Sequence, residues 1–82
     1  MKRKLPEQNP QDWLPIGQHI RTPDNMYSPV VYNAEAEDCA ERLHDGQIVE
    51  HLANGAVAVK FDRYPHTTDY TAAEARQFNK TF

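Results

Sequence analysis

The sequence predicts a small α+β domain built on an antiparallel sheet. Three observations lead to this prediction. Asn54-Gly55 is a residue pair that a tight type I′ turn favours, because both turn residues need φ > 0. Runs rich in Ile, Val, Leu and Phe flank this pair and suit strands, which gives a central β-hairpin over Gln47–Phe61. Ahead of the hairpin, small apolar residues recur at helical spacing and predict a packed helix over Ala34–His44.

A two-residue hairpin loop would also fix which residues face each other. Directly opposed residues in an antiparallel pair lie on one face of the sheet. The predicted pairs are Leu52 with Val57, Glu50 with Val59, and Ile48 with Phe61. One face of the hairpin is then apolar and is interrupted only by Glu50, while the other face is mostly polar.

The N-terminal region has the composition of a tail followed by short strands. Residues 1–15 contain three prolines among polar residues and are predicted to be a flexible tail, which leaves residues 16–82 as a single small domain. Trp13 either docks on the core as a lid or projects as a hook for a partner. Gly17–Thr22 suits a strand. Pro29 confines a second strand within Met26–Tyr32 to the edge of the sheet, or to a start after the proline.

The predicted helix over Ala34–His44 has a cap and an apolar stripe. Asn33 can cap its first turn, where acidic residues favour the helix dipole, and Gly46 suits its end. The stripe is narrow enough to pack closely on the apolar face of the hairpin. Its members are Ala36, Cys39, Ala40 and Leu43.

Two further elements are predicted after the hairpin. Thr67–Thr71 is a candidate strand, and Thr71 can then cap a short C-terminal helix over Ala72–Asn79. Glu74 stands at the capping-box position of that helix.

Composition and charge narrow the class of protein. The chain has 82 residues, one cysteine and no apolar run near the roughly 18 residues that span a bilayer, which favours a soluble cytoplasmic protein without an internal disulfide. Residues 23–62 carry eight acids against two bases, a sum of −6 within a total of −3. An acidic middle disfavours general binding of duplex DNA and favours a protein partner with a basic surface. Small size alone suggests a bacterial or phage-like regulator.

The hairpin resembles that of SH3-like barrels, the superfamily that includes KOW and Tudor modules. The resemblance rests on Gly46-x-Ile48-Val49 followed by Gly55-x-Val57-x-Val59-x-Phe61-Asp62. It implies a small, strongly bent five-stranded barrel whose last strand ends in a helical turn. The predicted helix before the hairpin would be an insertion, and no functional residue follows from the resemblance.

No arrangement of residues points to catalysis or to a bound cofactor. Compact zinc spacings are absent, so a metal could only be held by a fold-dependent cluster of Cys39, His44, Asp45 and His51. Cys39 on an apolar stripe is typical of a small core residue rather than a nucleophile. We therefore expect a protein that is not an enzyme and that has no cofactor and no metal.

The expected function is binding to another protein by occupying one of its surfaces. The candidate contacts are Trp13, the acidic helix face (Glu35, Asp38, Glu41) and the loop residues Lys60, Arg63, Tyr64, His66 and Tyr70. The two loop tyrosines could equally close one end of the core. The alternative function is binding of RNA or single-stranded DNA through the basic and aromatic loop with the Lys2-Arg3-Lys4 tail. A homo-oligomer formed through strand edges is also open.

Overall fold

The computed structural model describes residues 9–32 and 40–81. Its elements in chain order are α1 (Pro10–Trp13), β1 (His19–Arg21), β2 (Val30–Tyr32), β3 (Ala40–Arg42), β4 (Asp45–His51), the 3-10 turn η2 (Ala53–Gly55), β5 (Val57–Phe61), β6 (Thr67–Tyr70), α2 (Ala72–Ala75) and β7 (Asn79–Lys80). Every strand pairing within this part of the chain is antiparallel, which confirms the predicted antiparallel sheet.

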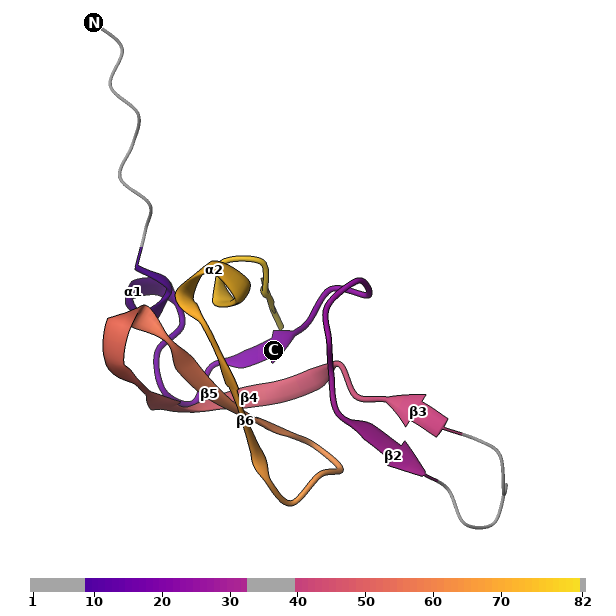
Figure 1. Ribbon diagram of the computed structural model, residues 1–82. Coiled ribbons are helices and arrows are strands. Elements are labelled where there is room, and N and C mark those ends of the chain that lie inside the picture. The colour runs from indigo at the N-terminus through magenta and orange to yellow at the C-terminus, as the bar shows by residue number, and fades with distance from the viewer. Residues whose placement is uncertain (1–8, 33–39, 82) are drawn as a thin grey trace, which may run out of the picture.

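The strands form two sheets. Five of them lie in the order β6-β5-β4-β1-β7, and β2 and β3 pair separately as a second, two-stranded sheet. The five-stranded sheet is open, since β6 and β7 are its edges, so the strands do not close into a barrel. Figure 1 shows α1 and α2 together at one end of this sheet and β2–β3 extending from it on the other side.

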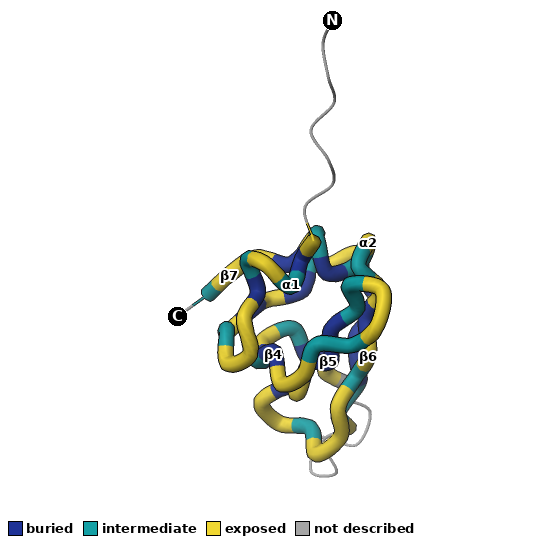
Figure 2. Tube along the Cα trace, turned by 90° about the vertical axis from the view of Figure 1, so that its left-hand side faces the viewer, coloured by how far each residue is buried: buried dark blue, intermediate teal, exposed yellow. Residues whose placement is uncertain are grey.

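The core lies on the inner face of the five-stranded sheet. It is built from the fully buried side chains of β1, β4 and β5, with additions from the N-terminal segment and from the stretch around α2 (Figure 2). The core residues are Leu14, Ile20, Met26, Leu43, Ile48, Val57, Val59, Phe61, Tyr70, Ala75 and Phe78. Among the residues that the structure describes, no helix is long and apolar enough to cross a membrane.

The central hairpin is confirmed, but the predicted register is wrong. Leu52 and Ala56 close a three-residue loop through a 2.8 Å hydrogen bond, and Asn54 and Gly55 both have positive φ (61° and 79°). The ladder then shifts by one more residue at a β-bulge between Ile48 and Glu50. As a result Ile48 lies opposite Val59 rather than opposite Phe61.

The charge on Glu50 gives a physical reason for this register. A two-residue loop would place the Glu50 carboxylate opposite Val59 on the apolar face, where desolvation of an unpaired charge costs several kcal/mol or more. In the structure Glu50 lies opposite Ala58 and is exposed. The extra residue of the bulge, Val49, then returns Ile48 to the inner face, where its side chain is fully buried.

The predicted helix over Ala34–His44 is wrong from residue 40 onward, and residues 34–39 lie outside the described part of the chain. Ala40–Arg42 is strand β3, paired with β2. A short stripe of small residues buries little area and gives only weak support to a helix, whereas pairing with the β-branched and aromatic residues of β2 supplies a complete ladder. Leu43 is nevertheless a core residue, as its place in the stripe suggested.

The domain begins earlier than the predicted boundary at residue 16. Pro10–Trp13 is a helical turn capped by the Asn9 side chain, and Leu14 is fully buried in the core. Gln11 attaches this segment to the hairpin, because its Nε2 atom donates to the carbonyl groups of Leu52 (2.7 Å) and Ala56 (2.8 Å). The predicted tail of residues 1–15 is therefore too long at its C-terminal end, and residues 1–8 lie outside the description.

The strand after the hairpin and the cap of the last helix are as predicted. Thr71 and Glu74 form a capping box, in which each side chain accepts a hydrogen bond from the backbone N–H of the other. The helix is shorter than expected: it ends at Ala75, and Asn79–Lys80 pairs with β1 as β7. Phe78, between the two, enters the core.

Replacing Thr71 with alanine should lower the free energy of unfolding by about 1 kcal/mol, because the Glu74 N–H would lose its side-chain acceptor at the helix start. The measurement is urea unfolding followed by circular dichroism. Thr71→Ser keeps the hydroxyl and is the matched control, so it should lie close to the wild type. Equal losses in both variants would contradict a stabilising role for the cap.

Candidate interaction surface

The β2–β3 pair forms an arm that stands apart from the five-stranded sheet (Figure 1). Its register places Val30 opposite Arg42, Val31 opposite Glu41, and Tyr32 opposite Ala40. Successive residues of a strand point to opposite faces, so the arm has an inner face with Val31 and Glu41 and an outer face with Val30, Tyr32 and Arg42.

The inner face of the arm is held against the main sheet. Val31 packs on the core, and the Glu41 carboxylate accepts a 2.6 Å hydrogen bond from Arg63, which lies in the turn between β5 and β6. Both charged side chains are more than half exposed, so this ion pair is worth at most about 1 kcal/mol. It orients the arm more than it stabilises the fold.

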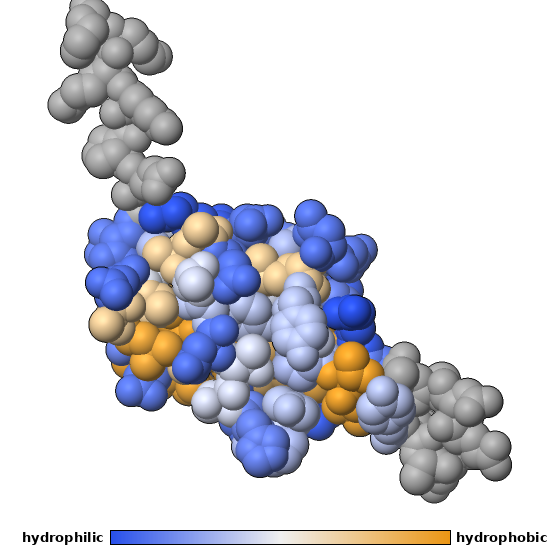
Figure 3. Space-filling model, in the orientation of Figure 1, coloured by the Kyte–Doolittle hydropathy of each residue, from blue (hydrophilic) through white to orange (hydrophobic). Residues whose placement is uncertain are grey.

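The outer face of the arm is open to solvent. Tyr32 is 73% exposed, Arg42 is exposed, and Val30 is half-buried. Figure 3 shows apolar surface at the arm, next to the atoms drawn in grey. Arg42 has no ion-pair partner within residues 9–32 and 40–81. Arginine and tyrosine are two of the residue types that are enriched in protein interfaces, so the outer face of the arm is a candidate interaction surface.

A hollow of about 220 Å³ lies where the arm joins the main sheet. Two ion pairs flank it: Arg63 with Glu41, and Arg21 with Asp45 at 3.0 Å. Its lining is polar apart from one leucine and consists of Arg21, Glu41, Arg42, Leu43, His44, Asp45, Asp62 and Arg63. Because acids and arginines balance there, the hollow does not select an anion or a cation by charge alone.

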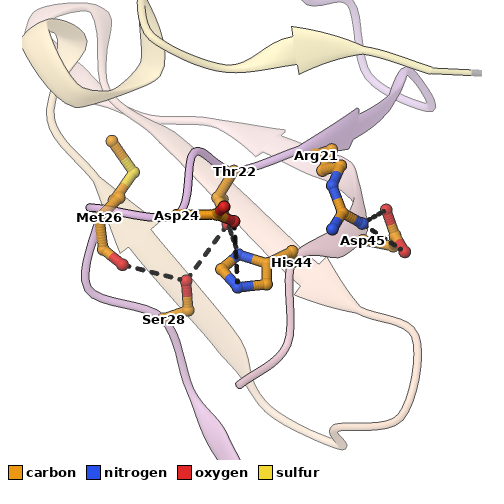
Figure 4. Close-up of polar contacts among 7 residues, drawn as sticks. All are labelled: Arg21, Thr22, Asp24, Met26, Ser28, His44 and Asp45. Atoms are coloured by element: carbon orange, nitrogen blue, oxygen red, sulfur yellow. Dashed lines mark hydrogen bonds and ion pairs between the residues drawn. The ribbon is translucent and has the colours of Figure 1, made fainter. Parts of the chain in front are cut away.

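A buried polar cluster connects three chain segments beneath the arm (Figure 4). The Thr22 hydroxyl contacts Nδ1 of His44 at 2.9 Å and the Ser28 hydroxyl at 3.2 Å. Asp24 lies 3.9 Å from the other ring nitrogen of His44. The order of Asp24 carboxylate, His44 imidazole and Thr22 hydroxyl resembles a catalytic triad. Thr22 and Ser28 are 1% and 0% exposed, however, so no substrate could reach their hydroxyl groups. The cluster is structural.

The histidines of the possible metal cluster do not come together. His44 contacts Thr22, whereas Nε2 of His51 contacts the Leu14 carbonyl oxygen at 2.8 Å. No group of three or more metal-ligating side chains occurs in the part of the chain that the structure describes. The predicted cluster also includes Asp45 and Cys39. Cys39 lies outside the described residues.

The predicted contact residues fall in several places rather than on one surface. Four of them lie in β3 or in the turn between β5 and β6, which an ion pair joins: Glu41, Arg63, Tyr64 and His66. The rings of Tyr64 and His66 pack edge to face, with 5.5 Å between their centres. Lys60 is exposed between two buried residues of β5 and so lies on the outer face of the five-stranded sheet. Glu35 and Asp38 lie outside the described residues.

Two aromatic residues of the predicted set pack against the body of the domain. Trp13 is half-buried against the core with Nζ of Lys80 5.6 Å from its ring centre, which agrees with the lid interpretation. Tyr70 is 3% exposed, its ring packs edge to face on Phe61 and Phe78, and its hydroxyl donates to the Tyr27 carbonyl at 3.2 Å. Tyr70 is thus a core residue and not a surface contact.

Burial raises the pKa of the Tyr70 hydroxyl to about 12, with a smaller contribution from the negative charge of Glu74. The unfolded chain should therefore ionise Tyr70 first, near pH 10, and the folded domain should lose on the order of 2 kcal/mol between pH 10 and pH 12. Urea unfolding at pH 8 and at pH 11.5 (about 1.5 units above the ordinary tyrosine pKa) measures this loss.

Tyr70→Phe should be about 1 kcal/mol less stable at pH 8, because it lacks the hydrogen bond to Tyr27, but should show a smaller loss at high pH. Tyr32→Phe is the control, since Tyr32 is 73% exposed and does not contribute to the Tyr70 pKa, and it should keep the wild-type pH dependence. An identical loss in Tyr70→Phe and the wild type would show that other groups cause the alkaline destabilisation.

Tyr32 and Arg42 are not among the candidate contacts that the sequence predicts. The signal for Tyr32 was present: it stands two residues after Val30 in a predicted strand, so the two share a face. Arg42 lies in the stretch that the sequence predicts as a helix, and only its pairing with Val30 brings it to the outer face of the arm.

Comparisons with known proteins give no match: no family model fits the chain, and neither the curated proteins nor the solved structures contain a significant relative. The resemblance of the hairpin to SH3-like modules therefore stays a prediction.

Proposed function

We propose that this protein is a small, non-enzymatic regulatory module of the cytoplasm that binds another protein and acts by occupying a surface on it. The observation that carries the proposal is the outer face of the arm, where Tyr32 and Arg42 stand exposed on two strands that, among the described residues, pair only with each other. Tyrosine and arginine are among the residues that most often dominate binding energy in protein interfaces.

The geometry of the arm supports recognition by a preorganised surface. Its inner face is fixed by Val31 on the core and by the Glu41–Arg63 ion pair, so binding need not order the strands. The polar hollow at its base adds charged groups at the rim, which is where interfaces place them. A partner with a basic surface is favoured, because residues 23–62 sum to −6.

Binding of RNA or single-stranded DNA is less well supported. Among the loop residues expected to carry it, Tyr70 is buried and Arg63 is paired with Glu41. Lys60 lies on the sheet face, away from Tyr64 in the turn, so cation and aromatic ring do not form one stacking surface.

The test is an affinity capture of partners with and without nuclease, followed by titration of the purified partner against variants. Tyr32→Ala combined with Arg42→Ala should weaken binding at least tenfold, as expected for removal of two interface anchors. Tyr27→Ala is the matched control, because Tyr27 is as exposed as Tyr32 but lies outside the arm. It should bind like the wild type.

Two results would overturn the proposal. Equal binding by the double variant and the wild type would place the contact elsewhere. Capture that disappears with nuclease, together with an affinity for oligonucleotides that falls steeply with salt, would favour the nucleic-acid alternative.

A further inference from the structure

The β2 strand has an outer edge that no other strand covers. Within residues 9–32 and 40–81, β2 pairs only with β3. The Leu43 N–H donates to the Pro29 carbonyl at 3.0 Å, which marks these two residues as a hydrogen-bonded pair at the base of the arm. Such pairs alternate along an antiparallel ladder with pairs whose backbone groups point outward. Val30 and Tyr32 therefore direct their N–H and C=O groups away from β3, along the outer edge of β2.

This edge is only three residues long, but it lacks the other features by which proteins usually protect an exposed strand. Protected edges carry charges, a proline or a bulge that prevents pairing. The β2 strand carries no charged residue, and its ladder with β3 is regular. Pro29 does not block the edge either, because at its position a backbone N–H would point toward β3. A two-stranded ribbon is the smallest antiparallel sheet, and an added strand would stabilise it further.

We propose that the β2 edge pairs with the β2 edge of a second copy of this chain. The two strands run antiparallel about a twofold axis at Val31, so that Val30 of each copy lies opposite Tyr32 of the other. Both residues then form hydrogen-bonded pairs through the backbone groups that the single chain leaves unpaired. The product is a four-stranded sheet in the order β3-β2-β2-β3. This inference goes beyond the proposed function and does not depend on it.

The side chains of β2 are complementary to themselves in this arrangement. Valine opposite tyrosine on the outer face is a β-branched and aromatic pair, which stabilises antiparallel sheets. Val31 lies opposite Val31 of the second copy on the inner face. Pairing of the two β2 strands places no like charges opposite each other, because β2 itself carries no charged residue.

The other edge of the arm does not offer the same pairing. A twofold axis at the centre of β3 would place Glu41 directly opposite Glu41 of the second copy, and like charges in that position are destabilising. Glu41 is also held by Arg63 in its own chain. The self-complementary edge is therefore β2, and an interface this short predicts a weak, concentration-dependent dimer.

Sedimentation velocity of the full chain over a wide range of concentration tests the proposal. The wild type should shift from monomer to dimer, and Val30→Pro should weaken the dimer about tenfold or more, because it removes an outward donor from each copy but none from the β2–β3 ladder. Circular dichroism shows whether this variant keeps its fold. Tyr27→Ala is the control and should dimerise like the wild type.

Disulfide trapping gives an independent readout in a Cys39→Ser background. Residues that face each other as a non-hydrogen-bonded pair lie about 4.5 Å apart at Cα, within the range that a disulfide spans. Val31→Cys should therefore form covalent dimers under mild oxidation, and Glu41→Cys should not. A strictly monomeric wild type, dimerisation unaffected by Val30→Pro, or preferential trapping through position 41 would each overturn the proposal.

Discussion

Replacing Phe61 with alanine is expected to cost about 4 kcal/mol of unfolding free energy, the range for removing a fully buried aromatic ring. Phe61 is 0% exposed and packs edge to face on Tyr70 at 6.3 Å, so its loss leaves a cavity in the centre of the core. Domains of this size are stabilised by only roughly 4 to 12 kcal/mol in total, so much of the population should unfold near physiological temperature.

Urea unfolding of the Phe61→Ala variant measures this loss directly. Tyr32→Ala removes an aromatic ring of similar size from an exposed position and is the matched control, with an expected change below about 0.5 kcal/mol. If both variants lost similar amounts of stability, the core assigned to the inner sheet face would be wrong.

Replacing Gly46 with alanine is expected to cost about 3 kcal/mol, and replacement with valine more, because β4 and β5 approach too closely there for a side chain. A Cβ atom on Gly46 would lie 2.9 Å from the Lys60 carbonyl oxygen, 2.9 Å from Cγ1 of Val59 and 3.2 Å from Cα of Phe61. Two of these atoms belong to the backbone of the paired strand, so relief requires the hairpin itself to move.

The control for Gly46 is Gly17→Ala. Gly17 has φ of +97°, which strains any side chain, but a Cβ there would meet only Nε2 of Gln47 at 4.0 Å. Its expected cost is about 1–2 kcal/mol of backbone strain. A larger loss for Gly17→Ala than for Gly46→Ala, in unfolding curves measured under the same conditions, would contradict the close approach of β4 to β5.

The sequence was informative wherever local chemistry decides the structure. Asn54 and Gly55 form the turn of the hairpin. Thr71 and Glu74 cap the first turn of the last helix. The β2 strand begins at Val30, directly after Pro29. Each of these residues acts through its own dihedral angles or through a neighbour within a few positions, so no knowledge of the remaining fold is needed.

The failures have one physical cause, which is competition from distant parts of the chain. The hairpin register depends on moving Glu50 out of the core, and Ala40–Arg42 becomes a strand because β2 supplies a partner. Neither effect is visible in a short window of sequence. The candidate surface was the feature predicted least well. The pairing of β2 with β3 is what places Arg42 beside Tyr32. The burial of Tyr70 depends on its packing against Phe61 and Phe78.

The attachment of Leu14 and Gln11 has a consequence for handling the molecule. A truncated protein that starts at residue 16 would lose the fully buried Leu14 side chain. It would also lose both hydrogen bonds from the Gln11 side chain to the backbone at the hairpin loop. Such a truncation should be prone to proteolysis and aggregation, whereas an affinity tag joined ahead of residue 9 leaves these contacts in place.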